Sequence, residues 1–249
     1  MDLLEKIRSH EAHLGVIGLG YVGLPLAVEC CKAGFTVTGI DINEERVAQL
    51  LEGKSYIIDV PSEELAPLVA SGRFRPSTDF SLLRETDTVN ICVPTPLRKT
   101  KDPDVSFIVA AVEQIRATLH RTQLIVLEST TYPGTTDELI LPMLEETGLK
   151  VGEDFFLAFS PERVDPGNAR YNTQNIPKVV GGVTPRCTLA AATLYRQTLE
   201  TVVEVGSTRV AEMTKLLENI HRAVNIGLVN EMKMICDRMG IDVHEVIRA

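Results

Sequence analysis

The sequence lacks several features that mark particular protein classes. It has no tryptophan, and aromatic residues make up only 5% of its 249 residues, so no binding platform built on indole rings is expected. Its 25 Lys and Arg are outnumbered by 34 Asp and Glu. Proteins that bind nucleic-acid backbones usually carry a basic face, and this balance predicts no nucleic-acid partner. No apolar run has the length of a membrane span, so no membrane partner is expected.

Cysteine and histidine are few and scattered, with five of each. The cysteines show neither disulfide-framework nor metal-site spacing, and each is most simply a small buried hydrophobe. Reduced thiols are typical of the cytosol, which predicts a cytoplasmic protein. No two histidines stand at ligand spacing with a carboxylate, so no metal is expected. Residues 1–13 mix charged and apolar side chains, unlike a signal peptide.

Short apolar runs alternate with amphipathic stretches along most of the chain. Near-continuous apolar runs are typical of parallel strands covered on both faces. The alternation predicts an α/β fold with a doubly wound parallel sheet. The predicted strands are His13–Ile17, Thr36–Ile40, Thr88–Val93, Gln123–Leu127, Phe155–Phe159, Lys178–Val180 and Thr201–Val205. The predicted helices are Val22–Ala33, Asn43–Glu52, Ser62–Ser71, Val105–His120, Thr135–Glu146, Pro185–Leu199 and 207–239.

A glycine-rich turn follows the first predicted strand. Residues 18–23 read Gly-Leu-Gly-Tyr-Val-Gly and open the helix Val22–Ala33, which is the context that a dinucleotide-binding fingerprint requires. Gly18 permits the tight turn, Gly20 lets the backbone approach a pyrophosphate, and Gly23 lets helix and strand pack closely. The start of the helix offers N–H groups to the phosphates. The pattern predicts a Rossmann-like domain.

Asp41 directly follows the second predicted strand. A carboxylate at this position accepts hydrogen bonds from the ribose of adenosine, and it would repel a 2′-phosphate. NAD is therefore favoured over NADP as the cofactor. Arg46 has two readings that the sequence leaves open: a side chain near the same ribose, or a charge on a solvated helix face.

The last part of the chain has a different character. The predicted helix 207–239 contains no proline, and its apolar positions cover more than one face, as in helices buried on several sides. Gly206 and Ser207 form a plausible hinge and N-cap. We therefore expect a nucleotide-binding domain at 1–206 and the start of a helical domain at 207–249.

Further polar clusters follow the later strands, where ligands lie in open parallel sheets. Thr95 lies between two prolines after one strand, and Thr130 lies in a hydroxyl-rich segment after the next. Glu162 and Arg163 follow the strand Phe155–Phe159. On the long helix, an i, i+4 spacing puts Lys215 and Asn219 on one face, where the two can stabilise a developing oxyanion. Taken alone, that pair is more simply part of a solvated helix surface.

Together these segments resemble the UDP-glucose/GDP-mannose dehydrogenase family over nearly the whole chain, from Val16 to Ile247. The resemblance rests on residues 18–25, on Val-Pro-Thr-Pro at 93–96, on Ser129-Thr130 with Pro133-Gly134, on Ser-Pro-Glu at 160–162, and on Lys215 with Asn219. Residues 128–136 and 160–168 are most similar to the branch that oxidises UDP-N-acetylglucosamine and related N-acetyl hexosamines.

The resemblance implies oxidation of a sugar C6 alcohol to a carboxylate in two NAD-dependent hydride transfers. It assigns NAD contacts to Gly18, Gly20, Tyr21, Val22, Gly23, Asp41, Arg46, Thr95 and Thr130. It assigns catalytic roles to Glu162, Lys215, Asn219 and Thr130, and substrate contacts to Glu162, Arg163, Lys215 and Asn219. It also implies a UDP-sugar substrate and a homodimer formed through the helix 207–239.

One departure from the family pattern concerns the cysteine nucleophile that its members use. That cysteine lies in a Gly-rich motif beyond the long helix, and none of Cys30, Cys31, Cys92, Cys187 and Cys236 has this context. The expectation is that residues 1–249 form a fragment that binds NAD without completing the oxidation. Two alternatives stay open: a β-hydroxyacid-type dehydrogenase, which also carries Lys-x-x-x-Asn, and a non-catalytic nucleotide-binding module that dimerises.

Overall fold

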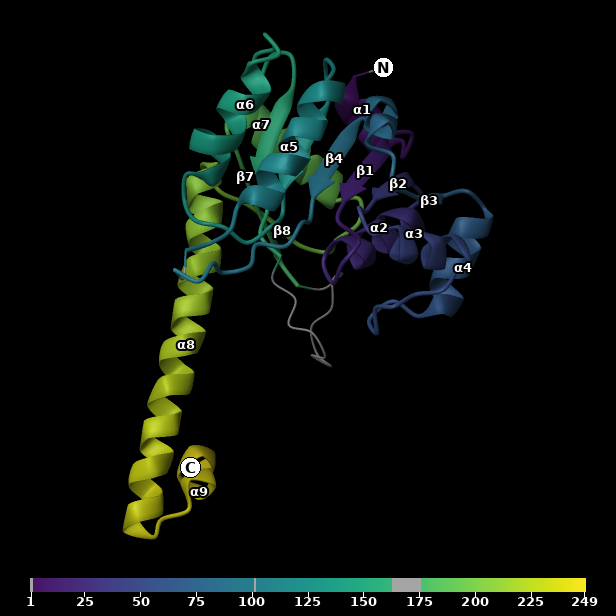
Figure 1. Ribbon diagram of the computed structural model, residues 1–249. Coiled ribbons are helices and arrows are strands. Elements are labelled where there is room, and N and C mark those ends of the chain that lie inside the picture. Colours follow the sequence, from purple (N-terminus) through teal and green to yellow (C-terminus); the bar gives the residue numbers. More distant parts are fainter. Residues whose placement is uncertain (1, 101, 163–175) are drawn as a thin grey trace. The chain divides into compact units, whose positions relative to one another are not determined.

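The computed structural model describes residues 2–100, 102–162 and 176–249. The chain divides into two compact units, Met1–Glu212 and Met213–Ala249. The first unit contains a sheet with helices on both of its faces (Figure 1). The predicted domain boundary at 206/207 stays a prediction.

The sheet has eight strands in the order β3-β2-β1-β4-β5-β6-β7-β8. Strand order therefore steps outward from β1 in both directions, which is the doubly wound pattern. The strands are β1 (His13–Ile17), β2 (Thr36–Ile40), β3 (Phe74–Ser77), β4 (Thr88–Ile91), β5 (Leu124–Leu127), β6 (Phe156–Phe159), β7 (Lys178–Gly182) and β8 (Val202–Glu204). The predicted fold class is confirmed.

The sheet is mostly rather than wholly parallel. Strand β7 pairs antiparallel with β6, with Phe159 opposite Gly181, and β8 runs parallel to β7. A continuous apolar run identifies a strand buried on both faces, but it does not reveal the strand's direction. As a result of the reversal, the first residue of β7, Lys178, lies at the edge of the sheet where β6 ends.

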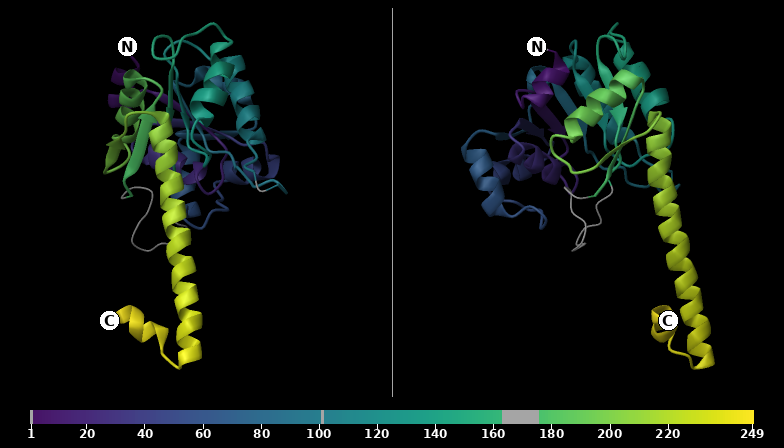
Figure 2. Two further views of the ribbon diagram at one scale, coloured as in Figure 1. Left: turned by 90° about the vertical axis from the view of Figure 1, so that its left-hand side faces the viewer. Right: turned by 180° about the vertical axis from the view of Figure 1, so that it is seen from behind.

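Two layers of helices bury the two faces of the sheet. In β5, Leu124 and Val126 face one layer, while Ile125 and Leu127 face the other. The first layer includes α1 (Leu3–Arg8), α2 (Gly23–Lys32) and α7 (Pro185–Tyr195), and the second includes α5 (Ser106–Thr118) and α6 (Leu141–Glu145). Figure 2 shows the layers from two further sides. The remaining elements of this unit are α3 (Glu44–Leu51), α4 (Ser62–Ala70), η1 (Phe80–Glu85) and the π-helical turn η2 (Thr135–Ile140).

Strand β3 and helix α1 are absent from the sequence-based prediction. Strand β3 contains Pro76, which argues against a strand in the sheet interior but is tolerated at an edge, and β3 pairs only with β2 in the described sheet. Helix α1 buries Leu3 and Ile7 against the first layer. A short helix with two buried apolar residues gives a weak periodic signal.

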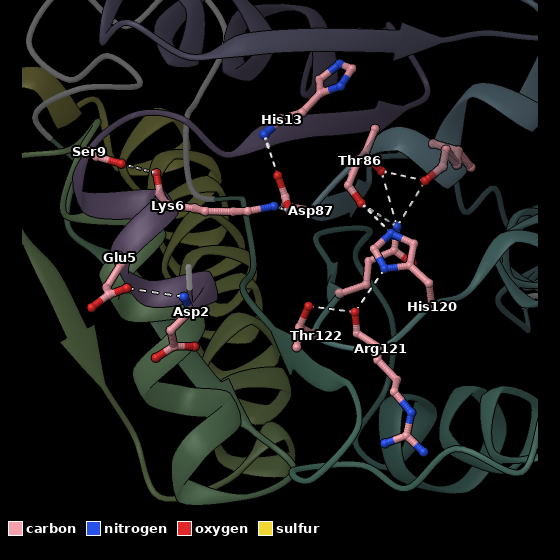
Figure 3. Close-up of polar contacts among 12 residues, drawn as sticks. Asp2, Glu5, Lys6, Ser9, His13, Thr86, Asp87, His120, Arg121 and Thr122 are labelled. Carbon is pink, nitrogen blue, oxygen red and sulfur yellow. Dashed lines mark hydrogen bonds and ion pairs between the residues drawn. The ribbon is translucent and has the colours of Figure 1, made fainter.

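An ion pair ties α1 to the amino-terminal edge of the sheet. Lys6 Nζ lies 2.6 Å from Asp87 Oδ1, and the backbone N–H of His13 donates to Asp87 Oδ2 at 2.9 Å. Figure 3 shows both contacts, with His120 beside them bonded to the carbonyl oxygen of Thr86. Asp87 precedes β4 and His13 begins β1, so this cluster lies at the edge opposite the carboxyl ends of the strands.

The C-terminal elements are α8 (Thr208–Met239) and α9 (Val243–Arg248). Ser207 caps α8, because its Oγ accepts a hydrogen bond from the N–H of Val210 at 3.3 Å, as predicted. Many apolar side chains of α8 are exposed, among them Met213, Leu217, Ile220, Val224, Leu228 and Met234. Across the described residues, no helix combines the length and apolar character needed to cross a bilayer.

Candidate functional site

A cavity of about 730 Å³ lies at the carboxyl ends of the strands in the first unit. Its wall follows β1, β2, β4, β5 and the segment after β6, all of which end at the same edge of the sheet. The predicted site residues that line it are Gly18, Gly20, Tyr21, Val22, Asp41, Arg46, Thr95, Thr130 and Glu162. The structure thus brings together residues as far apart in the sequence as Gly18 and Glu162.

The three glycines of the turn differ in what surrounds them. Gly18 has φ +91°, and a Cβ there would lie 2.7 Å from the carbonyl oxygen of Cys92. A Cβ on Gly23 would lie 1.9 Å from the carbonyl oxygen of Gly18. Around Gly20 a Cβ would meet nothing within 4 Å, and Gly20 lines the cavity. The fold therefore requires Gly18 and Gly23, whereas Gly20 leaves space for a ligand.

Helix α2 begins at this turn with no side-chain cap. Its N-cap residue is Val22, and no side chain accepts a hydrogen bond from the first turn. In this first turn Leu24 donates its N–H to the carbonyl oxygen of Gly20 at 3.1 Å, and Pro25 has no N–H, so an anion would be bound by the backbone N–H groups that precede Leu24. Phosphate groups bind at such helix starts because the helix dipole and the N–H groups both favour negative charge.

Asp41 is buried, with 7% of its surface exposed, and it braces the turn. Its Oδ2 accepts the N–H of Leu19 at 2.9 Å, and its Oδ1 accepts the N–H of Asn43 at 2.9 Å. Each carboxylate oxygen can accept a further hydrogen bond. The carboxylate therefore holds the glycine turn against β2 and keeps acceptor capacity for a ribose.

Arg46 and Tyr56 line a second hollow next to this end of the cavity. The Arg46 guanidinium lies 5.4 Å from the centre of the Tyr56 ring, and Tyr56 donates its hydroxyl proton to the carbonyl oxygen of Leu19 at 2.6 Å. Burial and the nearby charge of Asp41 raise the pKa of Tyr56 to about 12, so the phenol keeps the proton that it donates. Sequence reasoning missed Tyr56, which precedes α4 in a segment without a motif.

The loops after β4 and β5 are joined by hydroxyl groups. Ser129 donates to the carbonyl oxygen of Val93 at 2.7 Å, and Thr95 donates to the carbonyl oxygen of Thr130 at 2.6 Å. These two hydrogen bonds link the loop after β4 to the loop after β5 and restrict the backbone conformation of both. Thr95 and Thr130 are thereby fixed at the wall of the cavity.

A buried polar cluster closes the far end of the cavity. Lys178 Nζ lies 2.6 Å from Glu128 Oε2 and 3.1 Å from Glu162 Oε2. Glu128 Oε1 also accepts from Asn90 Nδ2 and from the hydroxyl of Tyr195, each at 2.7 Å. Glu128 and Glu162 line the cavity, so the cluster presents its carboxylates to a ligand and keeps its cation behind them.

The charges of this cluster follow from its contacts. Burial by itself lowers the pKa of Lys178, but the two carboxylates outweigh it and raise that pKa well above its usual value. Burial and the Glu128 charge raise the pKa of Tyr195. Lys178 is therefore a cation and Tyr195 a neutral phenol. Sequence reasoning also missed Lys178. The signal that could have identified it is a lysine at the start of a predicted buried strand, where an unpaired charge is costly.

Three predicted residues that the structure describes are not among those lining the cavity, and a fourth has no described position. Gly23 packs beneath the turn, and Arg163 lies outside the described residues. Lys215 and Asn219 lie on α8 in the second unit, each partly buried. Within the described ranges, no three His, Cys, Asp or Glu side chains gather as metal ligands.

Comparisons with known proteins identify the family of this chain. Residues 12–199 match the model of the UDP-glucose/GDP-mannose dehydrogenase NAD binding domain, and residues 209–249 match the central domain of the same family. The chain belongs to the UDP-glucose/GDP-mannose dehydrogenase family. NAD is accordingly the cofactor of its nucleotide-binding domain.

Several members of this family are similar over nearly all of the chain. It is 40% identical over 95% of its length to a Pseudomonas aeruginosa UDP-N-acetyl-D-glucosamine 6-dehydrogenase, covering 56% of that protein. The structure of a UDP-D-ManNAc dehydrogenase from Pyrococcus horikoshii superimposes with a TM-score of 0.90 at 34% identity, over 95% of this chain and 56% of that one. A GDP-mannose dehydrogenase from P. aeruginosa gives 0.86 at 27% identity, with 94% and 55% covered. The chain thus spans about half the length of these relatives.

The glycine geometry predicts that alanine at position 23 lowers stability, whereas alanine at position 20 lowers NAD affinity. Gly23→Ala forces a methyl group into the Gly18 carbonyl and should lower the free energy of unfolding by about 2 kcal/mol or more. Gly20→Ala meets open space and should change that free energy by less than about 0.5 kcal/mol, yet weaken NAD binding at least about tenfold because the backbone can no longer approach the pyrophosphate. Denaturant melts and NAD titrations check both. Full NAD affinity in Gly20→Ala would contradict the assignment.

Proposed function

We propose that the cavity binds NAD and that the whole protein oxidises the C6 alcohol of a UDP-sugar to the uronic acid. The observation that carries the first part is the continuity of one cavity from Asp41, past the open backbone at Gly20, to Glu128 and Glu162. A dinucleotide is an elongated ligand with a central pyrophosphate. The glycine turn lies between two polar ends in the same way.

The order of the strands supports one orientation of the cofactor. Asp41 follows β2 and the glycine turn follows β1, whereas Thr95 and Glu128 follow β4 and β5 on the other side of β1. With the pyrophosphate at α2 and the adenosine ribose at Asp41, the second nucleoside extends over β4 and β5. The nicotinamide end is therefore the end that Thr130, Glu128 and Glu162 line.

The roles of the protein groups follow from this orientation. NAD supplies the hydride acceptor when it is bound. Glu162 presents a carboxylate at the nicotinamide end, where it can take up a proton from the substrate alcohol. Thr130 lines the cavity at the same end. We assign oxyanion stabilisation to Lys215 and Asn219, which donate from one face of α8, and a substrate contact to Arg163.

The NAD proposal is tested by titrating NAD into the wild type and into Asp41→Ala. Loss of the ribose hydrogen bonds to this carboxylate should cost about 1.5–3 kcal/mol of binding free energy. The matched control is Asp59→Ala, because Asp59 is exposed and lines neither this cavity nor the neighbouring hollow at Tyr56. Unchanged NAD affinity in Asp41→Ala would remove Asp41 from the site.

The identity of the sugar rests on the relatives. The UDP-N-acetyl-D-glucosamine 6-dehydrogenase of P. aeruginosa and the UDP-D-ManNAc dehydrogenase of P. horikoshii are named for N-acetylated sugars. Residues 128–136 and 160–168 resemble that branch. This supports a UDP-N-acetylhexosamine as substrate. The runner-up, a dehydrogenase of small β-hydroxy acids, shares the Lys-x-x-x-Asn pattern, but family membership favours the sugar nucleotide.

The substrate proposal predicts which alcohol drives NAD reduction. In a protein that includes the region found in the relatives beyond the matched half, UDP-N-acetylglucosamine or its epimers should reduce two NAD per sugar, because an alcohol becomes a carboxylate. Small β-hydroxy acids should reduce none, and they serve as the control. Absorbance of NADH checks this, and reduction with hydroxy acids alone would favour the runner-up.

We infer a cytoplasmic location from the cysteines. All five are free and buried, the state that reducing compartments maintain. None has the spacing of a disulfide framework.

We also propose that the chain forms a homodimer through α8. Its exposed apolar side chains include Leu217 at 65% and Val224 at 62%. Large exposed apolar surfaces mark association sites.

The dimer proposal is tested by light scattering. The wild type should show twice the mass of one chain, and Leu217→Glu with Val224→Glu should shift it toward one chain, because burying two carboxylates at the interface is costly. Ile58→Glu makes the same change at a side chain that is 91% exposed on the first unit, and it should leave the mass unchanged. A clean monomer for the wild type at high concentration would overturn the proposal.

A further inference from the structure

Glu212, near the start of α8, is a buried carboxylate to which the proposed chemistry assigns no role. None of its surface is exposed. Its Oε2 accepts the N–H of Gly134 at 2.6 Å, and its Oε1 accepts the N–H and the hydroxyl of Thr136 at 3.0 and 2.8 Å. A buried carboxylate is costly unless it is hydrogen-bonded, and three donors from one short segment meet this one.

The segment that supplies these donors begins η2 and does not cap itself. The N-cap residue of η2 is Gly134, with φ +100°, a left-handed conformation that favours glycine. Glycine has no side chain that could accept an N–H of the first turn. Thr136 is the second residue of η2, and its N–H is one that an N-cap side chain normally accepts. Glu212 therefore supplies from α8 the acceptor that the N-cap residue lacks.

The capped turn is bonded to the segment that lines the cavity. Thr135 donates its N–H and its hydroxyl to the carbonyl oxygen of Tyr132 at 3.2 and 2.8 Å. The Thr135 hydroxyl also lies 2.5 Å from the hydroxyl of Thr131. Thr131 directly follows Thr130, whose carbonyl oxygen accepts the Thr95 hydroxyl at 2.6 Å. A continuous set of hydrogen bonds thus leads from the capped turn to the wall of the cavity.

We propose that Glu212 is a positioning residue for the nicotinamide end of the cavity. By capping η2, it holds the preceding segment, residues 129–134, in the conformation that places Thr130 on the cavity wall. The proposal rests on the cofactor orientation given above. Glu212 is not among the residues that line the cavity, so it acts through this segment and not on the ligand itself.

Ion pairs at the surface also join the start of α8 to η2. Arg209 Nε lies 3.1 Å from Asp137 Oδ2, and Arg209 Nη2 lies 2.7 Å from Glu138 Oε1. The side chains of Arg209 and Glu138 are 53% and 66% exposed, and exposed ion pairs contribute little to stability. Loss of the buried carboxylate should therefore affect the segment more than loss of these pairs, and Glu138 offers a matched control.

Replacing Glu212 by glutamine keeps the size of the side chain and turns one acceptor oxygen into a donor. The amide can satisfy the donors on one of its two sides, and its NH₂ group then faces an N–H on the other. In Glu212→Gln the backbone N–H of Gly134 or of Thr136 should exchange with solvent at least about tenfold faster, because a hydrogen bond to a charged group is lost. Glu138→Gln makes the same change at an exposed carboxylate of η2 and should leave both exchange rates unchanged.

The binding test compares NAD with ADP, which contains the adenosine and the pyrophosphate but no second nucleoside. Residues 129–134 follow β5, on the side of β1 away from β2 and Asp41. Calorimetry should therefore show the same ADP affinity in the wild type and in Glu212→Gln. NAD should bind about three- to tenfold more weakly to Glu212→Gln, because binding must then order the loosened segment. In Glu138→Gln both affinities should equal those of the wild type.

The outcomes separate this inference from the proposed function. Unchanged NAD affinity in folded Glu212→Gln overturns the inference, and so does an equal loss of NAD and ADP affinity, which would mean that Glu212 serves the domain as a whole. If Glu212→Gln does not fold, hydrogen exchange of the wild type without NAD decides: the N–H groups of Gly134 and Thr136 should be protected, and rapid exchange at both overturns the inference. Failure of the wild type to bind NAD would instead overturn the proposed function.

Discussion

The close approach of Gly23 to the carbonyl oxygen of Gly18 is the constraint on which the rest of the site depends. A Cβ on Gly23 would come within 1.9 Å of that oxygen, so no other residue lets α2 begin directly where β1 ends. This contact places the start of α2 at the carboxyl edge of the sheet, the position at which helix starts bind phosphate groups. The cavity reaches the backbone of the turn at Gly20, where no side chain intervenes.

The surrounding groups hold the backbone of that edge in position. Asp41 bonds to the N–H of Leu19 and ties β2 to the glycine turn, while Ser129 and Thr95 join the loops after β4 and β5. Each of these polar groups serves the fold and lines the cavity as well. A site built from such bonds is fixed before a ligand arrives, which reduces the entropy lost on binding.

The sequence reveals the parts of this site that depend on local order. The glycine turn and Asp41 follow from a strand, a turn and a helix in succession, and Thr95, Thr130 and Glu162 follow from their places after strands. Lys178 and Tyr195 belong to the same end of the cavity, but they come from a strand and a helix whose neighbours no local pattern reveals. Lys215 and Asn219 are recognisable by their spacing, and their place relative to the cavity does not follow from it.

The direction of β7 explains why the cluster exists at all. In a parallel strand the first residue lies at the edge opposite the site, as His13 does in β1. Because β7 runs against β6, with Phe159 opposite Gly181, the chain enters β7 beyond the end of β6, and Lys178 reaches Glu162 there. A lysine buried at that point is stable only with carboxylates beside it, and the ends of β5 and β6 supply them. This reversal between β6 and β7 therefore gives the site its buried cation.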